Sequence, residues 1–388
     1  MERNIKLLAI FNFFTDFKFH SAVLILYFVS VTGSYTLAMS LFAAVRVTSA
    51  LLEIPTGIFS DFIGRKKTVM LGAMAATISA ICYAAGHSYA PLFIGALFEG
   101  LSRSWYSGNN DALLYDSLNQ SGKKNTFTHY LGKTSAMFQV ALMIGAITGS
   151  ILAQWSFALI MWLSVIPQVL CFILSLFLIE PLQLTKEKSN IYSHLKKSMH
   201  LIWNNKHLRL LNIQGILRFG MGESSFQFNA AFIASVWPIW AIGLSRILSY
   251  GGASLGYWYS GKIIKNINEY NVLIFNNLYT RIINIIAYGH ATIFSPILMG
   301  TTSFFYGVAE VSNTSLLQKE FTDEQRATLA SLNSLFGSLF FGIFSPFLGL
   351  IADIYSPTVA LIMVQCLMLF VLYLQFKLKK MSKNILSA

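Results

Sequence analysis

The stretch Gly57-Ile-Phe-Ser-Asp61-Phe-Ile-Gly64-Arg65-Lys66-Lys67 separates two long apolar runs. The preceding run covers residues 35–59 and the following one covers residues 68–86. A helix needs about 20 mainly apolar residues to cross the hydrocarbon core of a bilayer, and both runs have about that length. The stretch is therefore predicted to form a tight turn between two membrane-spanning helices, with its three consecutive basic residues at the membrane surface.

The composition of the whole chain agrees with a lipid environment. Of its 388 residues, 55% are hydrophobic and 11% are charged, and the mean hydropathy is +0.59. Soluble domains have about 25% charged residues, so this chain has too few charges to cover a surface in water. A soluble enzyme, a disordered chain and a secreted disulfide scaffold are excluded. The three cysteines lie within apolar runs, which predicts buried hydrophobic side chains without disulfides or metal ligation.

Apolar runs of spanning length occur six times, stop, and then occur six times again. They cover residues 5–30, 35–59, 68–86, 91–117, 127–153 and 157–179, then 208–236, 239–260, 271–288, 293–317, 327–352 and 357–377, and are numbered spans 1 to 12. We expect a six-helix bundle over residues 1–180, a cytoplasmic linker over 181–206 and a second six-helix bundle over 207–388. In the linker, Ile191, Leu195, Met199 and Ile202 recur at helical spacing. Either a short helix on the inner leaflet or a solvated segment with partial helix fits that pattern.

The positions of lysine and arginine give the expected orientation. The net charge is +12. Basic residues occur in the loops after spans 2, 4, 6, 8 and 10 and in the tail after span 12, whereas the loops after the odd-numbered spans contain none. Loops rich in Lys and Arg stay in the cytoplasm, so both termini are predicted to be cytoplasmic. The positive charge therefore indicates membrane topology, and no nucleic-acid partner is expected.

Three weak correspondences at an offset of about 200 residues suggest an internal repeat. Gly57-x-x-x-Asp61 matches Gly256-x-x-x-Ser260, Asn110-x-x-Leu113-Leu114 matches Asn313-x-x-Leu316-Leu317, and Gly145-x-x-x-Gly149 matches Ser345-x-x-x-Gly349. Both halves are predicted to begin in the cytoplasm, so the repeat is parallel. Parallel six-helix halves with a substrate site between them at mid-depth are a recurring plan of transporters.

The stretch from Gly57 to Lys67 resembles the signature loop of the major facilitator superfamily, G-x-x-x-D-x-x-G-R-K/R. Three further stretches are similar to a bacterial exporter-like branch of it: Glu53-Ile-Pro-Thr-Gly57, Ser107 to Asp116, and Arg326 to Ser331. The resemblance implies an all-α integral membrane fold with twelve transmembrane helices in two six-helix bundles related by a parallel internal repeat. The chain departs from the drug-antiporter patterns at Ala96 in place of Arg, Ser150 in place of Pro and Ser260 in place of Asp.

The resemblance also implies a gate at the cytoplasmic end, formed by Gly57, Asp61, Gly64, Arg65 and Lys66. The two glycines are expected to permit close helix contact and a tight turn. Asp61 is expected to cap the N-terminus of a facing helix, with span 11 as the favoured partner. The basic residues are expected to pair with carboxylates such as Asp116. The alternative is that these charges only anchor the topology.

Polar and charged side chains within the spans mark a second group of candidates, because a charge in the bilayer core costs at least about 3 kcal/mol unless it faces a cavity or a partner. Asn12, Asp16 and His20 are spaced to share one helical face, as are Arg46 and Glu53. The predicted pathway contains Asn12, Asp16, His20, Arg46, Glu53, Glu99, Arg103, Arg218, Glu223, Gln227 and Glu310. Alternatively, some of these groups only lock helices together. Lys18 is expected to reach the membrane surface or to pair locally, and Arg281 is expected to be structural.

These observations predict a secondary active transporter that exports a small organic molecule, anionic or zwitterionic, by alternating access coupled to protons. Asp16, Glu99, Glu223 and Glu310 are the candidate proton carriers. Import of a metabolite or siderophore, and a transporter-like receptor or scaffold without transport, are the alternatives. No enzymatic activity, cofactor or metal is expected, and the partners are substrate, protons and membrane lipids. We expect a monomer in a bacterial cytoplasmic membrane.

Overall fold

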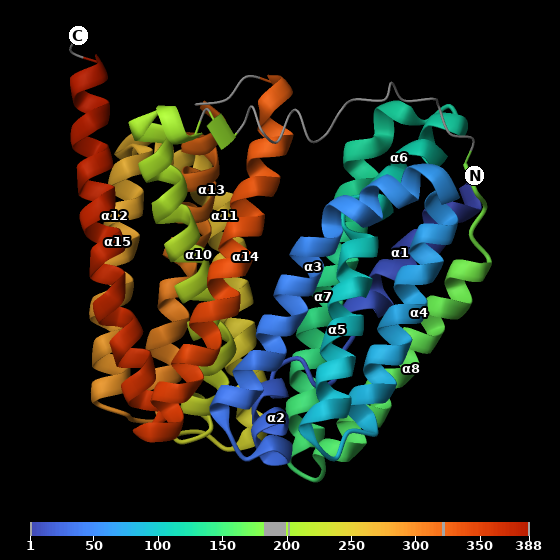
Figure 1. Cartoon of the computed structure of the whole chain (residues 1–388), viewed down its shortest axis with the longest axis horizontal. Coiled ribbons are helices and arrows are strands. Elements are labelled where there is room, and N and C mark those ends of the chain that lie inside the picture. Colours follow the sequence, from blue (N-terminus) through green and yellow to red (C-terminus); the bar gives the residue numbers. More distant parts are fainter. Residues whose placement is uncertain (1, 182–198, 201, 320–322, 387–388) are drawn as a thin grey trace. The chain divides into compact units, whose positions relative to one another are not determined.

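The computed structural model describes residues 2–181, 199–200, 202–319 and 323–386 (Figure 1). The described residues form helices joined by short turns, with no strands. The side chains of residues 323–330 and 383–386 are not described, so the predicted motif from Arg326 has no structural account. Most of the linker pattern, including Ile191 and Leu195, also lies outside the described residues.

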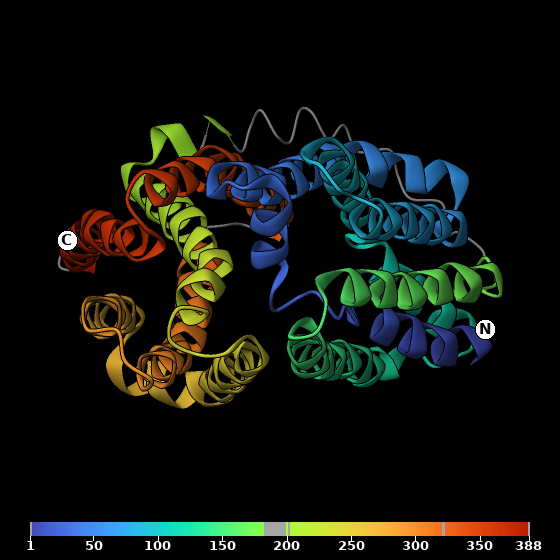
Figure 2. The ribbon, with the colours of Figure 1, turned by 90° about the horizontal axis from the view of Figure 1, so that it is seen from below.

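The predicted fold class is confirmed: the protein is an all-α integral membrane protein with two six-helix bundles in a parallel repeat. The chain divides into two compact units. Unit 1 contains Met1–Glu187 and Ile239–Gly243, and unit 2 contains Lys188–Pro238 and Leu244–Ala388. Figure 2 views the helices of each unit nearly end-on. Six helices in the described residues are individually long and apolar enough to cross a membrane, including Tyr35–Ile63 and Phe157–Leu176.

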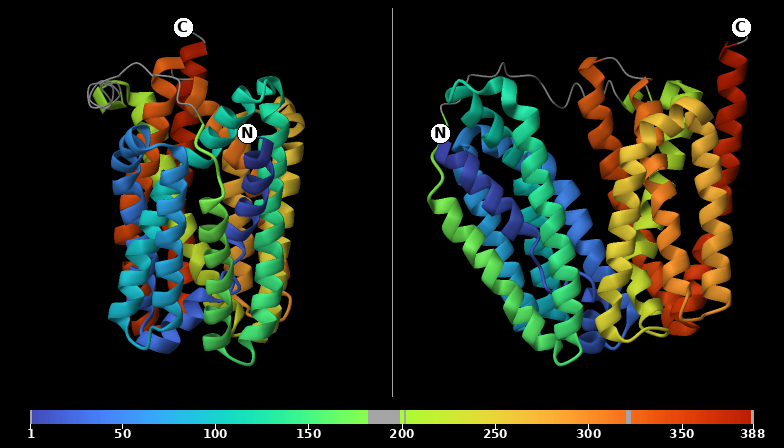
Figure 3. Two further views of the ribbon diagram at one scale, coloured as in Figure 1. Left: turned by 90° about the vertical axis from the view of Figure 1, so that its right-hand side faces the viewer. Right: turned by 180° about the vertical axis from the view of Figure 1, so that it is seen from behind.

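The helices of unit 1 follow spans 1 to 6. They are α1 (Glu2–Asp16), α2 (Leu24–Thr32), α3 (Tyr35–Ile63), α4 (Arg65–Ala84), α5 (Tyr89–Tyr106), α6 (Asn109–Gln120), α7 (Phe127–Ala153) and α8 (Phe157–Leu176). Helix α4 packs against α5 and α8, and α1 packs against α7 and α8. The N-terminus and the segment that follows α8 lie at the same end of this unit (Figure 3).

Spans 1 and 4 are each broken, which corrects the prediction of continuous helices. In span 4 the break is at Gly108, whose φ of +70° favours glycine. In span 1 residues 17–23 leave the helix, and their backbone lies against two glycines of α7. A Cβ added at Gly149 would lie 1.6 Å from the carbonyl oxygen of Phe19, and one at Gly145 would lie 2.9 Å from that of Lys18. The absence of side chains at these two positions therefore makes room for the broken segment.

The helices of unit 2 follow spans 7 to 12. They are α10 (Lys206–Ile233), α11 (Ile242–Ile267), α12 (Glu269–Gly289), α13 (Ser295–Lys319), α14 (Asp323–Ile354) and α15 (Pro357–Leu386). Glycines permit close contact between α11 and α13, because a Cβ at Gly256 would lie 2.0 Å from the carbonyl oxygen of Phe304. Helix α12 packs against α13 and α15, and α10 packs against α14 and α15.

A chain of four side-chain amides joins four helices of unit 2. Asn277 on α12 donates to Gln375 on α15 at 3.2 Å, and Gln375 donates to Gln214 on α10 at 3.4 Å. Gln214 then donates to Asn313 on α13 at 2.6 Å. All four side chains are buried. In a membrane such bonds contribute only about 0.6 kcal/mol each, but they fix which faces of the helices meet.

Candidate functional site

Unit 1 contains a cavity of about 590 Å³ that is lined by polar residues of spans 1, 2 and 4. Of the predicted pathway residues, Asn12, Asp16, His20, Arg46, Glu99 and Arg103 line it. Lys18, Tyr83, Asp111 and Gln168 line it as well. A cavity with both acids and bases inside an apolar bundle is where intramembrane charges are expected to act on ions or substrates.

Glu99 on α5 is the centre of a buried ion cluster in this cavity. Its Oε1 atom accepts from the Lys18 ammonium at 3.0 Å and from Arg103 Nη2 at 2.9 Å. Its Oε2 atom accepts from the hydroxyl of Tyr83 at 3.0 Å. The predicted i, i+4 pair of Glu99 and Arg103 is confirmed, whereas Lys18 is paired across 81 residues instead of reaching the membrane surface. Both carboxylate oxygens of Glu99 are therefore occupied.

Asp16 lies in the same cavity in a different environment. It is the last residue of α1, where the chain leaves the helix, and its carboxylate makes no ion pair or hydrogen bond within the described residues. The amide of Gln168 donates to the carbonyls of Phe14 and Thr15 at 3.3 and 3.4 Å and so binds the end of α1. The helical face assumed for Asn12, Asp16 and His20 is interrupted by the break, although all three line the cavity.

Only part of the predicted polar face of span 2 lines the cavity. Arg46 lines the cavity, but Glu53 does not, and Glu53 accepts a hydrogen bond from the hydroxyl of Ser107 at 3.1 Å. Glu53 therefore joins α3 to the break in span 4.

The predicted residues of unit 2 form two pairs. Arg218 on α10 bonds Glu310 on α13 at 2.7 Å, and Gln227 donates to Glu223 at 2.9 Å. Glu310 also lines a second cavity of about 460 Å³, together with Tyr257 and Lys319. An acid–base pair thus joins the first and fourth spans of each half, Lys18 with Glu99 and Arg218 with Glu310.

Amide pairs repeat the same relation between the halves. Asn110 of span 4 donates to Asn12 of span 1 at 3.4 Å, and Gln214 of span 7 donates to Asn313 of span 10 at 2.6 Å. Asn110 and Asn313 are the residues that the internal repeat aligns. Both kinds of pair are what a duplicated six-helix unit predicts.

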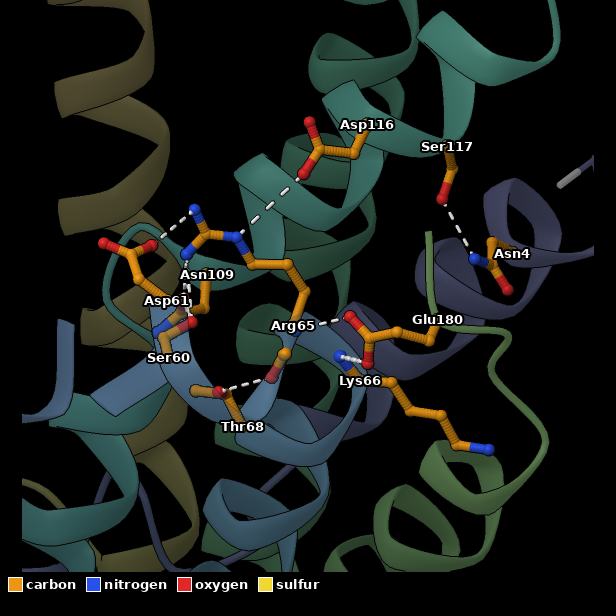
Figure 4. Close-up of polar contacts among 11 residues, drawn as sticks. Asn4, Ser60, Asp61, Arg65, Lys66, Thr68, Asn109, Asp116, Ser117 and Glu180 are labelled. Carbon is orange, nitrogen blue, oxygen red and sulfur yellow. Dashed lines mark hydrogen bonds and ion pairs between the residues drawn. The ribbon is translucent and has the colours of Figure 1, made fainter. Parts of the chain in front are cut away.

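The turn between α3 and α4 lies at Gly64, and Figure 4 shows Arg65, the first residue of α4, among its polar partners. Gly64 has a φ of +96°, so the expected tight turn requires glycine at this position. A Cβ added at Gly57 would have no neighbour within 4 Å in the described residues, so the close helix contact expected there is absent from them. Lys66 contributes its backbone N–H, which donates to Glu180 at 2.9 Å.

The side chain of Arg65 bridges three helices. It pairs with Asp61 at 3.1 Å and donates to Ser60 and to Asn109 on α6, at 2.9 Å in each case. The expected pairing with Asp116 is present at 4.0 Å, the outer limit of an ion pair. Asp61 is the exposed member of the group, with 58% of its side chain accessible. The proposed cap of span 11 by Asp61 involves the other unit and stays a prediction.

Sequence reasoning missed Glu180, which closes this network (Figure 4). Its two carboxylate oxygens accept from the backbone N–H groups of Arg65 and Lys66 at 2.7 and 2.9 Å. The first N–H groups of a helix have no partner within the helix, and an acid there also interacts favourably with the helix dipole. The side-chain amide of Asn4 accepts from the backbone N–H of the adjacent Ile179 and donates to the carbonyl of Ile179. The signal in the sequence was a helix that begins with three basic residues and therefore needs an acid from elsewhere.

We expect Glu180→Ala to destabilise unit 1 by about 1 kcal/mol, the usual value for loss of a helix cap. Glu180→Gln keeps one acceptor and should lose less. Thermal unfolding of the detergent-purified protein measures both. Equal unfolding temperatures for the wild type and Glu180→Ala would show that water replaces the cap without cost.

The comparisons with known proteins agree with this geometry. The family model described as Major Facilitator Superfamily matches residues 7–340. An uncharacterized transporter of Buchnera aphidicola is 24% identical over 309 residues, which are 77% of this chain and 76% of that protein. The uncharacterized MFS-type transporter YxaM of Bacillus subtilis is 22% identical over 360 residues, 86% of each chain.

Solved transporter structures have the same fold. A structure of the nucleoside transporter NupG matches with a TM-score of 0.79 and 14% identity, and covers 97% of this chain and 99% of that one. A bacterial homologue of the human lysosomal transporter Spinster matches with a TM-score of 0.75 and 13% identity over 97% of this chain and 96% of its own.

Proposed function

The chain belongs to the major facilitator superfamily, and from this premise we propose that it is a secondary active transporter that exports a small organic molecule by alternating access, coupled to protons. The observation that carries the proposal is the polar cavity of unit 1, where Asp16, Lys18 and Glu99 lie inside an apolar bundle. Such charges are costly to retain in a membrane unless they serve an ion or a substrate.

The cavity favours a solute that carries an anionic group. Arg103 donates hydrogen bonds from Nε and Nη2 to Glu99, and 44% of the Arg103 side chain remains accessible. A guanidinium has five N–H donors, so Arg103 can bind a carboxylate or phosphate group while it stays paired with Glu99. We propose an anionic or zwitterionic substrate for this reason.

The carboxylate environments favour Asp16 as the proton carrier. Glu99 is held by two cations and a hydroxyl, and Glu310 is held by Arg218. The carboxylates of Glu99 and Glu310 are therefore already engaged with cations. Asp16 has no such bond in the described residues and lines the cavity, so it can exchange a proton with water there.

Transport by reconstituted protein tests the function. The purified chain in proteoliposomes with an imposed pH gradient is screened against organic anions and zwitterions, and export and import are distinguished by the sign of the gradient. Counterflow, in which internal unlabelled solute drives uptake of labelled solute, detects alternating access without a gradient. Absence of both accumulation and counterflow for every solute would favour a receptor or scaffold. We propose the bacterial cytoplasmic membrane as the location, with both termini in the cytoplasm.

We expect Asp61→Asn to leave insertion and folding intact and to reduce transport severely. Asp61 is exposed and bonds only Arg65 in the described residues, so its loss costs little stability. The charge-retaining variant Asp61→Glu should keep a larger share of the rate. The measurement is counterflow together with the unfolding temperature of each variant. Normal transport by Asp61→Asn would leave the stretch with a role in topology alone.

A further inference from the structure

Arg281 on α12 is a buried cation for which the described residues supply no counter-ion. Arg281 is only 9% exposed to solvent. The Nε and Nη1 atoms are enclosed and have no acceptor among the described residues. No carboxylate of those residues forms an ion pair with it.

The other buried cations of the described bundles have identified partners. Lys18 bonds Glu99, and Arg218 bonds Glu310. Arg246 lies over the ring of Phe226, with 4.0 Å between the guanidinium carbon and the ring centroid. An uncompensated buried charge costs several kcal/mol even after the surroundings relax. Arg281 therefore differs from the rest in lacking a compensating group.

The surroundings of Arg281 are polar and lie between helices. Asn277, Arg281, Asn284 and Tyr288 are spaced by four, three and four residues and so share one face of α12. The amide of Asn277 donates to Gln375 at 3.2 Å, and that of Asn284 donates to Gln365 at 3.5 Å, both on α15.

We propose that Arg281 binds a small monovalent inorganic anion, with chloride as the probe, between α12 and α15. Water would satisfy the N–H donors but would leave the charge uncompensated. Arg281 lines neither of the two cavities described above, and the amides on both sides of it bind α15 directly, so only a small ion fits between the two helices.

Chloride titration of the purified full-length protein at constant ionic strength, with gluconate as the replacing anion, tests the site. A ligand that binds only the folded state raises stability in proportion to ln(1 + [L]/Kd). We expect a saturable rise of a few degrees in the unfolding temperature of the wild type. Arg281→Met should show no such rise and, in gluconate alone, should unfold no earlier than the wild type, because it removes the uncompensated charge. Arg246→Met, the matched control, should keep the chloride response.

Equilibrium binding of radioactive chloride to the wild type tests the proposal without a variant. Saturable binding that Arg281→Met abolishes supports it, and if that variant does not fold, Arg281→Lys should bind at least about tenfold more weakly, since it lacks the planar fork of donors. Absence of saturable binding to the wild type overturns the proposal. Equal binding by the wild type and either Arg281 variant overturns it as well. None of these outcomes depends on whether the protein transports a solute.

Discussion

Asp16→Asn is expected to abolish the accumulation of substrate driven by a pH gradient while sparing exchange of substrate across the membrane. Exchange needs no net proton movement, whereas accumulation needs a group that binds a proton on one side and releases it on the other. Asp16 lies at the end of α1, beside Lys18 and Arg103 in the same cavity. Burial favours the protonated form of a carboxyl group, and approach of a cation favours the ionised form, so a change of conformation can move the proton.

Accumulation and exchange measured in the same vesicles separate this role from a general loss of folding. Glu99→Gln is the informative comparison, because Glu99 is bonded to Lys18 and Arg103 and its replacement leaves both cations without a carboxylate. We expect that variant to lose exchange and stability together. If the amide variants of Asp16, Glu99, Glu223 and Glu310 all retain accumulation, these residues do not couple protons, and a sodium-coupled or uniport mechanism becomes the better hypothesis.

Gly149→Ala is expected to destabilise unit 1 strongly. The added Cβ would lie 1.6 Å from the carbonyl oxygen of Phe19, and a backbone atom cannot move aside as the end of a flexible side chain does. Overpacking of this kind costs about 1–3 kcal/mol and sometimes more. Because Lys18 lies next to Phe19, displacement of the segment should also disturb the Lys18–Glu99 bond and therefore reduce transport.

Gly132→Ala on the same helix is the matched control. A Cβ at Gly132 would have no neighbour within 4 Å in the part of the chain that the structure describes, and alanine is the better helix former by about 1 kcal/mol. Gly132→Ala should therefore unfold at or above the wild-type temperature, while Gly149→Ala should unfold well below it. If the two variants unfold at the same temperature, the broken segment does not rest on α7 as described.

The sequence predicted the helices well where hydrophobic length alone specifies them. The run at 127–153 coincides with α7, and the turn at Gly64 was expected from its glycine and the basic residues that follow it. The break in span 1 was not foreseen, because residues 17–23 contain neither Gly nor Pro. The groups that hold the break, Gly149 and Gln168, lie more than a hundred residues further along the chain.

The site was predicted in part for the same reason. Pairs at helical spacing, such as Glu99 with Arg103, follow from the helix period and could be read from the sequence. The partner of Lys18 depends on how α5 packs near the break, which no local pattern encodes. Glu180 was missed because the basic start of α4 signals only that an acid is needed, and the acid that caps it lies more than a hundred residues further along the chain.

The chain of amides in unit 2 has a consequence for the order in which this half of the protein matures. Its members lie on α10, α12, α13 and α15, and Gln375 on the last helix links Asn277 to Gln214. During synthesis, the first three of these helices enter the bilayer before α15 exists. Until then the amide N–H groups of Asn277 and the carbonyl of Gln214 lack the partner that they have in the finished bundle. The second half therefore completes its polar pairing only when α15 has entered the bilayer, and until then the three earlier helices carry amide groups without these partners.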